Sequence, residues 1–128
     1  TEGQPDVGAM HRTLLLGAYI WLTFSGTMHF LVDVVSQYIR RKRLPGPETT
    51  LYYGLNTSFA LGQVVFGLLC LWLAWQAPAV LNQRAVTVLS FAAAAGWIAI
   101  TFAFMSYWEP KMNIIVFVTL LAGATLIR

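Results

Sequence analysis

The chain has 128 residues, of which 58% are hydrophobic and only 10% are charged. Soluble globular domains carry about 25% charged residues, so this composition excludes a soluble domain and indicates an integral membrane protein. The net charge of +3 does not indicate nucleic-acid binding, because half of the eight basic residues form one cluster, Arg40–Arg43.

The first long apolar run predicts a membrane-spanning helix over about residues 13–39. It is too long for a cleavable signal peptide, so none is expected. Polar side chains inside the run recur at helical spacing and therefore share one face: Ser25, His29, Asp33 and Ser36.

Ionisable residues in a membrane segment are costly and usually face a cavity or the protein interior. We therefore expect His29 and Asp33 to form a coupled pair that handles a proton or binds a ligand. The simpler alternative is that His29 satisfies a hydrogen bond inside the bundle while Asp33 reaches the membrane surface.

Residues 40–50 hold the basic cluster followed by Pro-Gly-Pro, which cannot continue a helix. This loop and the last loop together carry more Lys and Arg than the other side of the predicted topology. Because cytoplasmic loops carry an excess of these residues, we expect loop 40–50 in the cytoplasm and both termini outside it. A basic block beside an apolar helix also suits anionic lipid headgroups.

The second predicted helix covers about 51–75 and carries Asn56 and Gln63 on one face. Neutral polar groups of this kind often hold membrane helices together; the alternative is that they line the same cavity as His29. The glycines of this helix would let another backbone approach closely: Gly54, Gly62 and Gly67.

The third predicted helix covers about 85–108 and has a small-residue centre, 92–96, that suits tight helix packing. Trp97 follows this centre. Its indole either packs in the core or presents its aromatic face to a cationic ligand.

A short turn at 109–111 makes the last two predicted helices antiparallel neighbours. The fourth helix, about 112–127, carries Asn113. It is marginal for a full span, so we expect it to extend further along the protein or to thin the membrane locally.

The residue pattern predicts no cofactor and no metal site. A haem held by two histidines needs both at one depth, and His11 would lie about 27 Å from His29 along a helix. The single cysteine, Cys70, can form no disulfide within the chain.

The segment Gly26–Asp33 resembles the His-x-x-x-Glu helix of the emopamil-binding protein family, which has the EXPERA fold. Tyr53–Asn56 and Leu71–Trp72 in the second segment also look similar to that family, as does the pair Met112–Asn113. The resemblance implies a bundle with four helices, as in the sigma-two receptor branch, and a sterol- or amine-like ligand.

The same family includes a sterol isomerase that uses a histidine and carboxylates to move a proton. Asp33 stands where the family has Glu, and Gly62–Gln63 stands near its second carboxylate. The family's termini are cytoplasmic, whereas the charges here predict the opposite. The resemblance therefore implies ligand binding more strongly than isomerase activity.

Taken together, the sequence predicts an all-α integral membrane four-helix bundle forming one domain, 1–128, with an internal cavity for a hydrophobic small molecule or lipid. In this hypothesis Asp33 is the anionic partner, His29 holds or shuttles a proton, and Trp97 is an aromatic wall. The candidate site residues are His29, Asp33, Asn56, Gln63, Trp97, Asn113 and Ser25. Two alternatives are a proton-coupled exporter that works as a homodimer and a non-catalytic accessory subunit of a membrane complex.

Overall fold

The structure, a computed structural model, describes Gly3 and residues 6–128. In this part of the chain, four helical segments are long and apolar enough to cross a membrane. The first is continuous through three elements: α1 (Val7–Phe30), the π-helix η1 (Leu31–Ser36) and α2 (Gln37–Ile39). The others are α3 (Pro47–Gln76), α5 (Arg84–Phe104) and α6 (Glu109–Leu126), with the short α4 (Pro78–Leu81) joining α3 to α5. The predicted all-α, multi-pass membrane architecture is confirmed.

Two helices begin earlier than the sequence pattern indicated. α1 starts at Val7 rather than near residue 13, because the Asp6 carboxylate accepts the backbone N–H of Gly8 at 3.0 Å and caps the helix. α3 starts at Pro47, since proline lacks an N–H that the first helical position does not need.

The turn between the last two helices also lies earlier than predicted. α5 ends at Phe104 and α6 begins at Glu109, so the connection is 105–108. Pro110 belongs to the first turn of α6, where its missing N–H costs no helical bond. The ammonium of Lys111 closes the turn by donating to the carbonyls of Met105 and Tyr107, at 2.6 and 3.0 Å.

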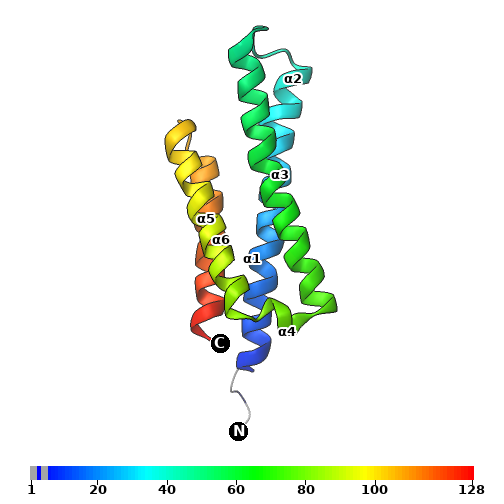
Figure 1. Cartoon of the computed structure of the whole chain (residues 1–128), viewed down its shortest axis with the longest axis vertical. Helices are drawn as coiled ribbons and strands as arrows, with labels where there is room; N and C mark the ends of the chain where they lie inside the picture. Colours follow the sequence, from blue (N-terminus) through cyan, green and yellow to red (C-terminus); the bar gives the residue numbers. More distant parts are fainter. Residues whose placement is uncertain (1–2, 4–5) are drawn as a thin grey trace.

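α1 lies between α3 and α6, and α5 packs mainly on α6 (Figure 1). The apolar core fills the space between α1, α6 and the second half of α3. Its largest buried side chains come from α1 and α6: Tyr19, Leu22, Ile114, Phe117 and Leu121. Tyr19 also bonds Ser90 of α5 through its hydroxyl at 2.8 Å, which ties the outer helix to the core.

The four segments differ in length. The segment Val7–Ile39 has 33 residues and α3 has 30, whereas α5 has 21 and α6 has 18. At a rise of about 1.5 Å per residue, only α5 and α6 match the hydrocarbon core of about 30 Å. The α1–α3 pair therefore rises well beyond the tip of the α5–α6 hairpin, as Figure 1 shows; we call this projecting part, residues 31–55, the arm.

At the opposite end of the molecule, His11 joins three elements. Its Nδ1 lies 2.6 Å from the carbonyl oxygen of Ala124 in α6, and its Nε2 lies 2.8 Å from Oδ1 of Asn82 after α4. The amide of Asn82 donates to the carbonyl of Pro78 at 2.9 Å, which fixes its orientation. This clamp explains why the first turns of α1 are part of the fold rather than a surface tail.

Glycine sets how closely α1 and α3 approach. A Cβ at Gly67 would collide with the Thr23 hydroxyl and lie 3.1 Å from the carbonyl oxygen of Tyr19. A Cβ at Gly26 would lie 2.9 Å from Cβ of Gln63. Gly54, also expected at a close approach, has nothing within 4 Å of such an atom. The tight packing that needs glycine thus lies at Gly26 and Gly67, below the arm.

Gly67→Ala should therefore lower the thermal stability of the protein, because overpacking costs about 1–3 kcal/mol. Gly54→Ala is the matched control on the same helix. It should leave stability unchanged or raise it by up to about 1 kcal/mol, since alanine is the better helix former. Thermal unfolding in detergent measures both variants, and equal melting temperatures would contradict the close packing of α1 on α3.

Candidate functional site

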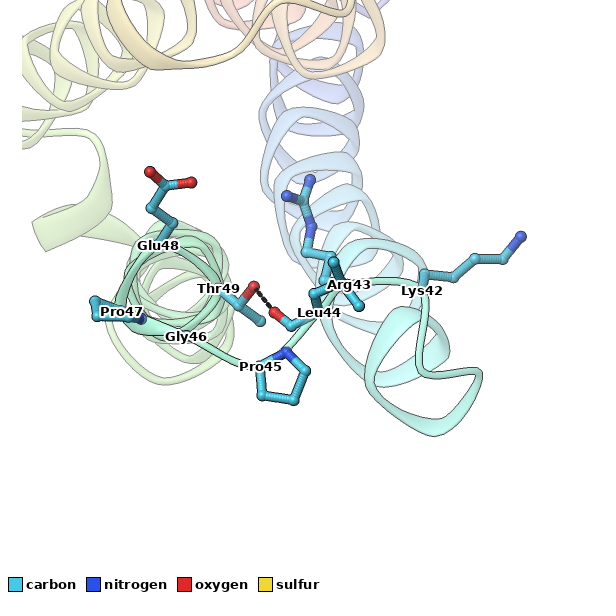
Figure 2. A pocket seen from close by; sticks show the side chains of 8 residues that line it. All are labelled: Lys42, Arg43, Leu44, Pro45, Gly46, Pro47, Glu48 and Thr49. Atoms are coloured by element: carbon cyan, nitrogen blue, oxygen red, sulfur yellow. Dashed lines mark hydrogen bonds between the residues drawn. The ribbon is translucent and has the colours of Figure 1, made fainter.

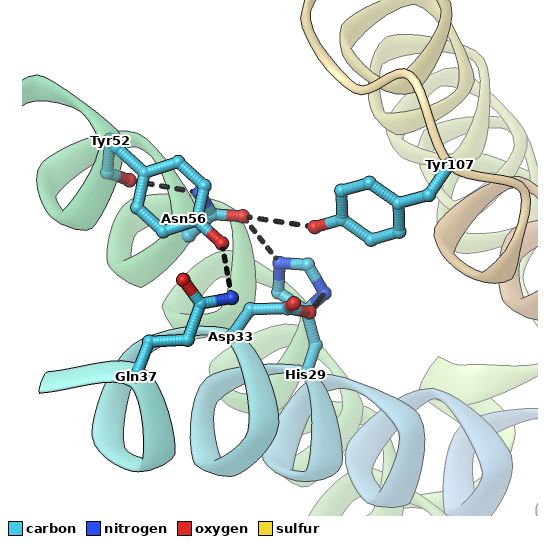
Figure 3. A network of polar contacts seen from close by, with 6 residues as sticks. All are labelled: His29, Asp33, Gln37, Tyr52, Asn56 and Tyr107. Carbon is cyan, nitrogen blue, oxygen red and sulfur yellow. Dashed lines mark hydrogen bonds and ion pairs between the residues drawn. The ribbon is translucent and has the colours of Figure 1, made fainter. Parts of the chain in front are cut away.

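A polar network joins α1, η1 and α3 at the base of the arm (Figure 3). Nδ1 of His29 lies 2.9 Å from Oδ2 of Asp33, as their spacing of one helical turn predicts. Nε2 of His29 lies 2.9 Å from Oδ1 of Asn56 on α3. The imidazole is thus held between a carboxylate of its own helix and an amide of the next.

The orientation of the Asn56 amide is fixed by a second bond. Its Nδ2 donates to the carbonyl of Tyr52 at 2.8 Å, so its Oδ1 must face His29. Both nitrogens of the imidazole then face oxygen atoms. Nε2 carries a proton that it donates to Asn56, and a further proton lies between Nδ1 and Asp33.

Two proton arrangements satisfy these contacts. In one, an imidazolium faces a carboxylate; in the other, a neutral His29 accepts from a protonated Asp33. The pair has no net charge in either arrangement, which lowers the cost of placing it in a membrane protein. In both arrangements one hydrogen bond joins Nδ1 of His29 to Oδ2 of Asp33.

Tyr107 brings the α5–α6 hairpin to the network. Its hydroxyl points at Oδ1 of Asn56 at 3.5 Å, at the long end for a hydrogen bond. Burial, followed by the nearby Asp33 carboxylate, raises the pKa of the Tyr107 phenol above its ordinary value. Tyr107 therefore stays protonated at neutral pH and acts as a donor on this side of the site.

The polar contacts continue from this network up the arm. Nε2 of Gln37 donates to the Tyr52 hydroxyl at 3.1 Å, one turn above the His29–Asn56 bond. Arg43 donates from Nε to Oε1 of Gln37 at 3.1 Å, and its guanidinium lies 3.3 Å from the centre of the Tyr52 ring. The α1–α3 seam is therefore polar from His29 to the loop.

Solvent exposure of the network increases from His29 to Asp33, in the direction of the loop. The side chain of His29 is 4% exposed, whereas that of Asp33 is 16% exposed. Below them, the ring of Phe59 packs edge-on against the imidazole with centroids 5.1 Å apart. The carboxylate of Asp33 is thus the more accessible member of the pair.

The remaining candidates lie apart from this network. Trp97 packs against Phe66 and Phe117 in the core and lies beside Gly62, about 9 Å below Asn56 along α3. Ser25 donates to the carbonyl of Leu22 in its own helix.

The other two polar candidates, Gln63 and Asn113, also make no hydrogen bond with this network. Gln63 is buried against Gly26, and its Nε2 has no hydrogen-bond partner among the described residues. Asn113 accepts the indole N–H of Trp21 through its backbone carbonyl at 2.9 Å.

Sequence reasoning missed Gln37, Tyr52 and Tyr107. The stripe was predicted to continue through Ser36 on the assumption of a regular α-helix. η1 has wider turns than an α-helix, so Gln37 continues the stripe instead. The four-residue spacing from Asp33 to Gln37, and from Tyr52 to Asn56, was the signal available in the sequence.

The site has no arrangement typical of a metal centre. Among the described residues, no group of three or more His, Cys, Asp or Glu side chains is placed to hold a metal ion. The donors that converge on Asp33 and Asn56 instead suit hydrogen bonding and proton exchange.

No protein-family model, curated protein sequence or solved structure matches this chain. The fold and the network define a class, a multi-pass integral membrane protein with an ionisable pair between two of its helices. Family membership beyond that class is a proposal.

Asn56→Ala should destabilise the protein, because it leaves Nε2 of His29 buried without its partner. A buried donor that loses its acceptor costs about 1–3 kcal/mol. Asn113→Ala is the matched control, since it removes the same amide but keeps the backbone carbonyl that Trp21 uses. Thermal unfolding in detergent should separate the two variants, and equal losses would show that the His29–Asn56 bond does not hold α1 to α3.

Proposed function

We propose that this membrane protein binds a hydrophobic small molecule that carries an amine or hydroxyl group, with Asp33 as its anionic partner. The observation that carries the proposal is the graded burial of the pair. His29 is sealed among the helices, and the carboxylate that it holds is the more open of the two. A bound amine or hydroxyl would donate to Asp33, and Tyr107 stands beside it as a second polar contact.

An apolar groove supports the hydrophobic part of this proposal. It has a volume of about 280 Å³, lies between α1 and α3, and is lined by Thr27, Phe30, Thr57, Ala60, Leu61 and Val64. Phe30 is the last residue of α1, directly before the π-helix that carries Asp33. The groove therefore offers apolar contact on the same two helical segments that hold the proposed polar anchor.

Proton transfer is the catalytic form of the same proposal. His29 and Asp33 lie within hydrogen-bond distance at 2.9 Å, and the resemblance to the sterol isomerase implies that such a pair moves a proton on a bound sterol. Gln63, near the position of that family's second carboxylate, has an unpaired and buried amide nitrogen. An amide cannot take the part of a carboxylate in proton transfer, so ligand binding without turnover is the main proposal.

Asp33→Asn should weaken binding of a radiolabelled hydrophobic tertiary amine by about tenfold or more, because a truncated charge partner costs about 2–5 kcal/mol. Glu109→Gln is the matched control, since it makes the same carboxylate-to-amide change on an exposed residue at the hairpin tip. Native mass spectrometry of each purified variant should show the same difference in copurified ligand. Unchanged binding by Asp33→Asn would exclude this site.

The charge pattern completes the proposal with an orientation. We place the Arg40–Arg43 loop, and with it the open side of the network, toward the cytoplasm. A cysteine introduced at position 41 should then react with a membrane-impermeant reagent only after the cells are opened. One introduced at position 84 should react on intact cells, and the reverse pattern would invert the topology.

A second candidate, an accessory subunit of a membrane complex, is favoured by the outer face of α5. Its small residues Ala92, Ala95 and Gly96 are exposed, and a Cβ on Gly96 would have nothing within 4 Å. In that case Gly96→Leu should release a partner that copurifies, while Asp33→Asn should not. The ligand-binding proposal predicts instead that Asp33→Asn lowers ligand retention and that Gly96→Leu does not.

A further inference from the structure

The far end of the arm carries a second polar region, where the loop after α2 leads into α3 (Figure 2). Two clefts lie beside this loop. One has a volume of about 610 Å³ and includes Lys42 together with Glu48. The other has a volume of about 780 Å³ and includes Arg41 and Arg43, and none of its ten lining residues is acidic. Arg43 also lines the first cleft, where Glu48 offsets one of the two positive charges, whereas the second cleft has two arginines and no acidic residue.

The backbone at Arg41 supports a functional role for its side chain. Its φ angle is +48°, a left-handed conformation that is uncommon for residues other than glycine and asparagine. The turn is held by bonds from the N–H of Arg41 to the carbonyl of Tyr38 and from that of Lys42 to the carbonyl of Gln37. This turn places the cationic side chain of Arg41 at the lining of the second cleft, in a backbone conformation that glycine adopts more easily.

Arg43 also lines this cleft, and two contacts hold its side chain. Its Nε donates to Gln37, and its guanidinium carbon lies 3.3 Å from the centre of the Tyr52 ring. A guanidinium has five N–H donors, and the bond to Gln37 uses the one at Nε. Figure 2 shows Lys42 leaving the loop in a different direction from Arg43, and Lys42 does not line the second cleft.

The rim of the cleft is apolar and highly exposed. Tyr38 is 70% exposed, Ile39 is 72% exposed and Leu44 is 87% exposed. Tyrosine is enriched at the level of lipid headgroups, and the two aliphatic side chains gain from contact with acyl chains rather than water. The cleft thus combines phosphate-binding donors with a surface for hydrocarbon.

We propose that this cleft binds the phosphate of an anionic phospholipid whose acyl chains lie along Ile39 and Leu44. Phosphate matches the fork of N–H donors that a guanidinium presents. A soluble phosphate would use the two arginines but not the apolar rim, so the lipid uses more of this surface. The cytoplasmic leaflet, which is rich in anionic lipid, is also where the basic loop is placed by its charge.

The test uses the whole chain in detergent, titrated with phosphatidylglycerol and with phosphatidylcholine, and bound lipid is counted by native mass spectrometry. Arg41→Gln and Arg43→Gln should each lower phosphatidylglycerol affinity about tenfold, as expected for a lost charge-assisted hydrogen bond. Arg40→Gln and Lys42→Gln remove the same charge from residues that do not line this cleft, and each should change affinity less than about twofold. Equal losses in all four variants would mean a diffuse electrostatic attraction and would overturn the proposal.

Two further measurements separate loss of lipid binding from loss of stability, and lipid from free phosphate. Arg41→Gly relieves the backbone and should melt no lower than the unmodified protein, yet it should lose phosphatidylglycerol as Arg41→Gln does. Glycerol phosphate, the soluble probe, should compete poorly with the lipid. Strong binding of glycerol phosphate would show a site for free phosphate, and equal binding of phosphatidylcholine would show that the anionic headgroup is not recognised.

Discussion

The close approach of α1 to α3 is the constraint on which the other features depend. Gly26 and Gly67 remove the side chains that would hold the two helices apart. At this separation, Oδ1 of Asn56 comes within 2.9 Å of the imidazole of His29. The hairpin tip then adds Tyr107 from a third direction, so the polar network exists only because the apolar packing below it is tight.

Electrostatic neutrality explains how an ionisable pair is accommodated between these helices. The Asn56 amide cannot turn, because its nitrogen is bonded to the carbonyl of Tyr52. His29 must therefore donate to it, and Asp33 shares the remaining proton. His11 has a similar pair of oxygen partners at the other end of α1, with Asn82 in the place of Asn56 and the carbonyl of Ala124 in that of the carboxylate, at a less buried position. Only at His29 is the second acceptor itself able to take the proton.

Local spacing predicted part of this site from the sequence alone. Four residues separate His29 from Asp33, and helix geometry alone brings them together. Asn56 and the four apolar segments were also anticipated, because neutral polar groups and long apolar runs are visible in one sequence. Tyr107 was not, since its placement depends on how far the α5–α6 hairpin extends along α1. Trp97 was assigned to the site because of its aromatic face. Its depth relative to His29 could not be predicted, because that depth depends on the same tertiary register.

The unequal helix lengths have a consequence for the surrounding lipid. The hairpin helices α5 and α6 have 21 and 18 residues, close to the thickness of a bilayer core, whereas the first segment and α3 have 33 and 30. A bilayer that covered both pairs of helices in full would change height around a single small protein, at a cost of a fraction of a kcal/mol for each Å of mismatch. Elastic strain of this kind is smallest where neighbouring surfaces of equal hydrophobic length meet.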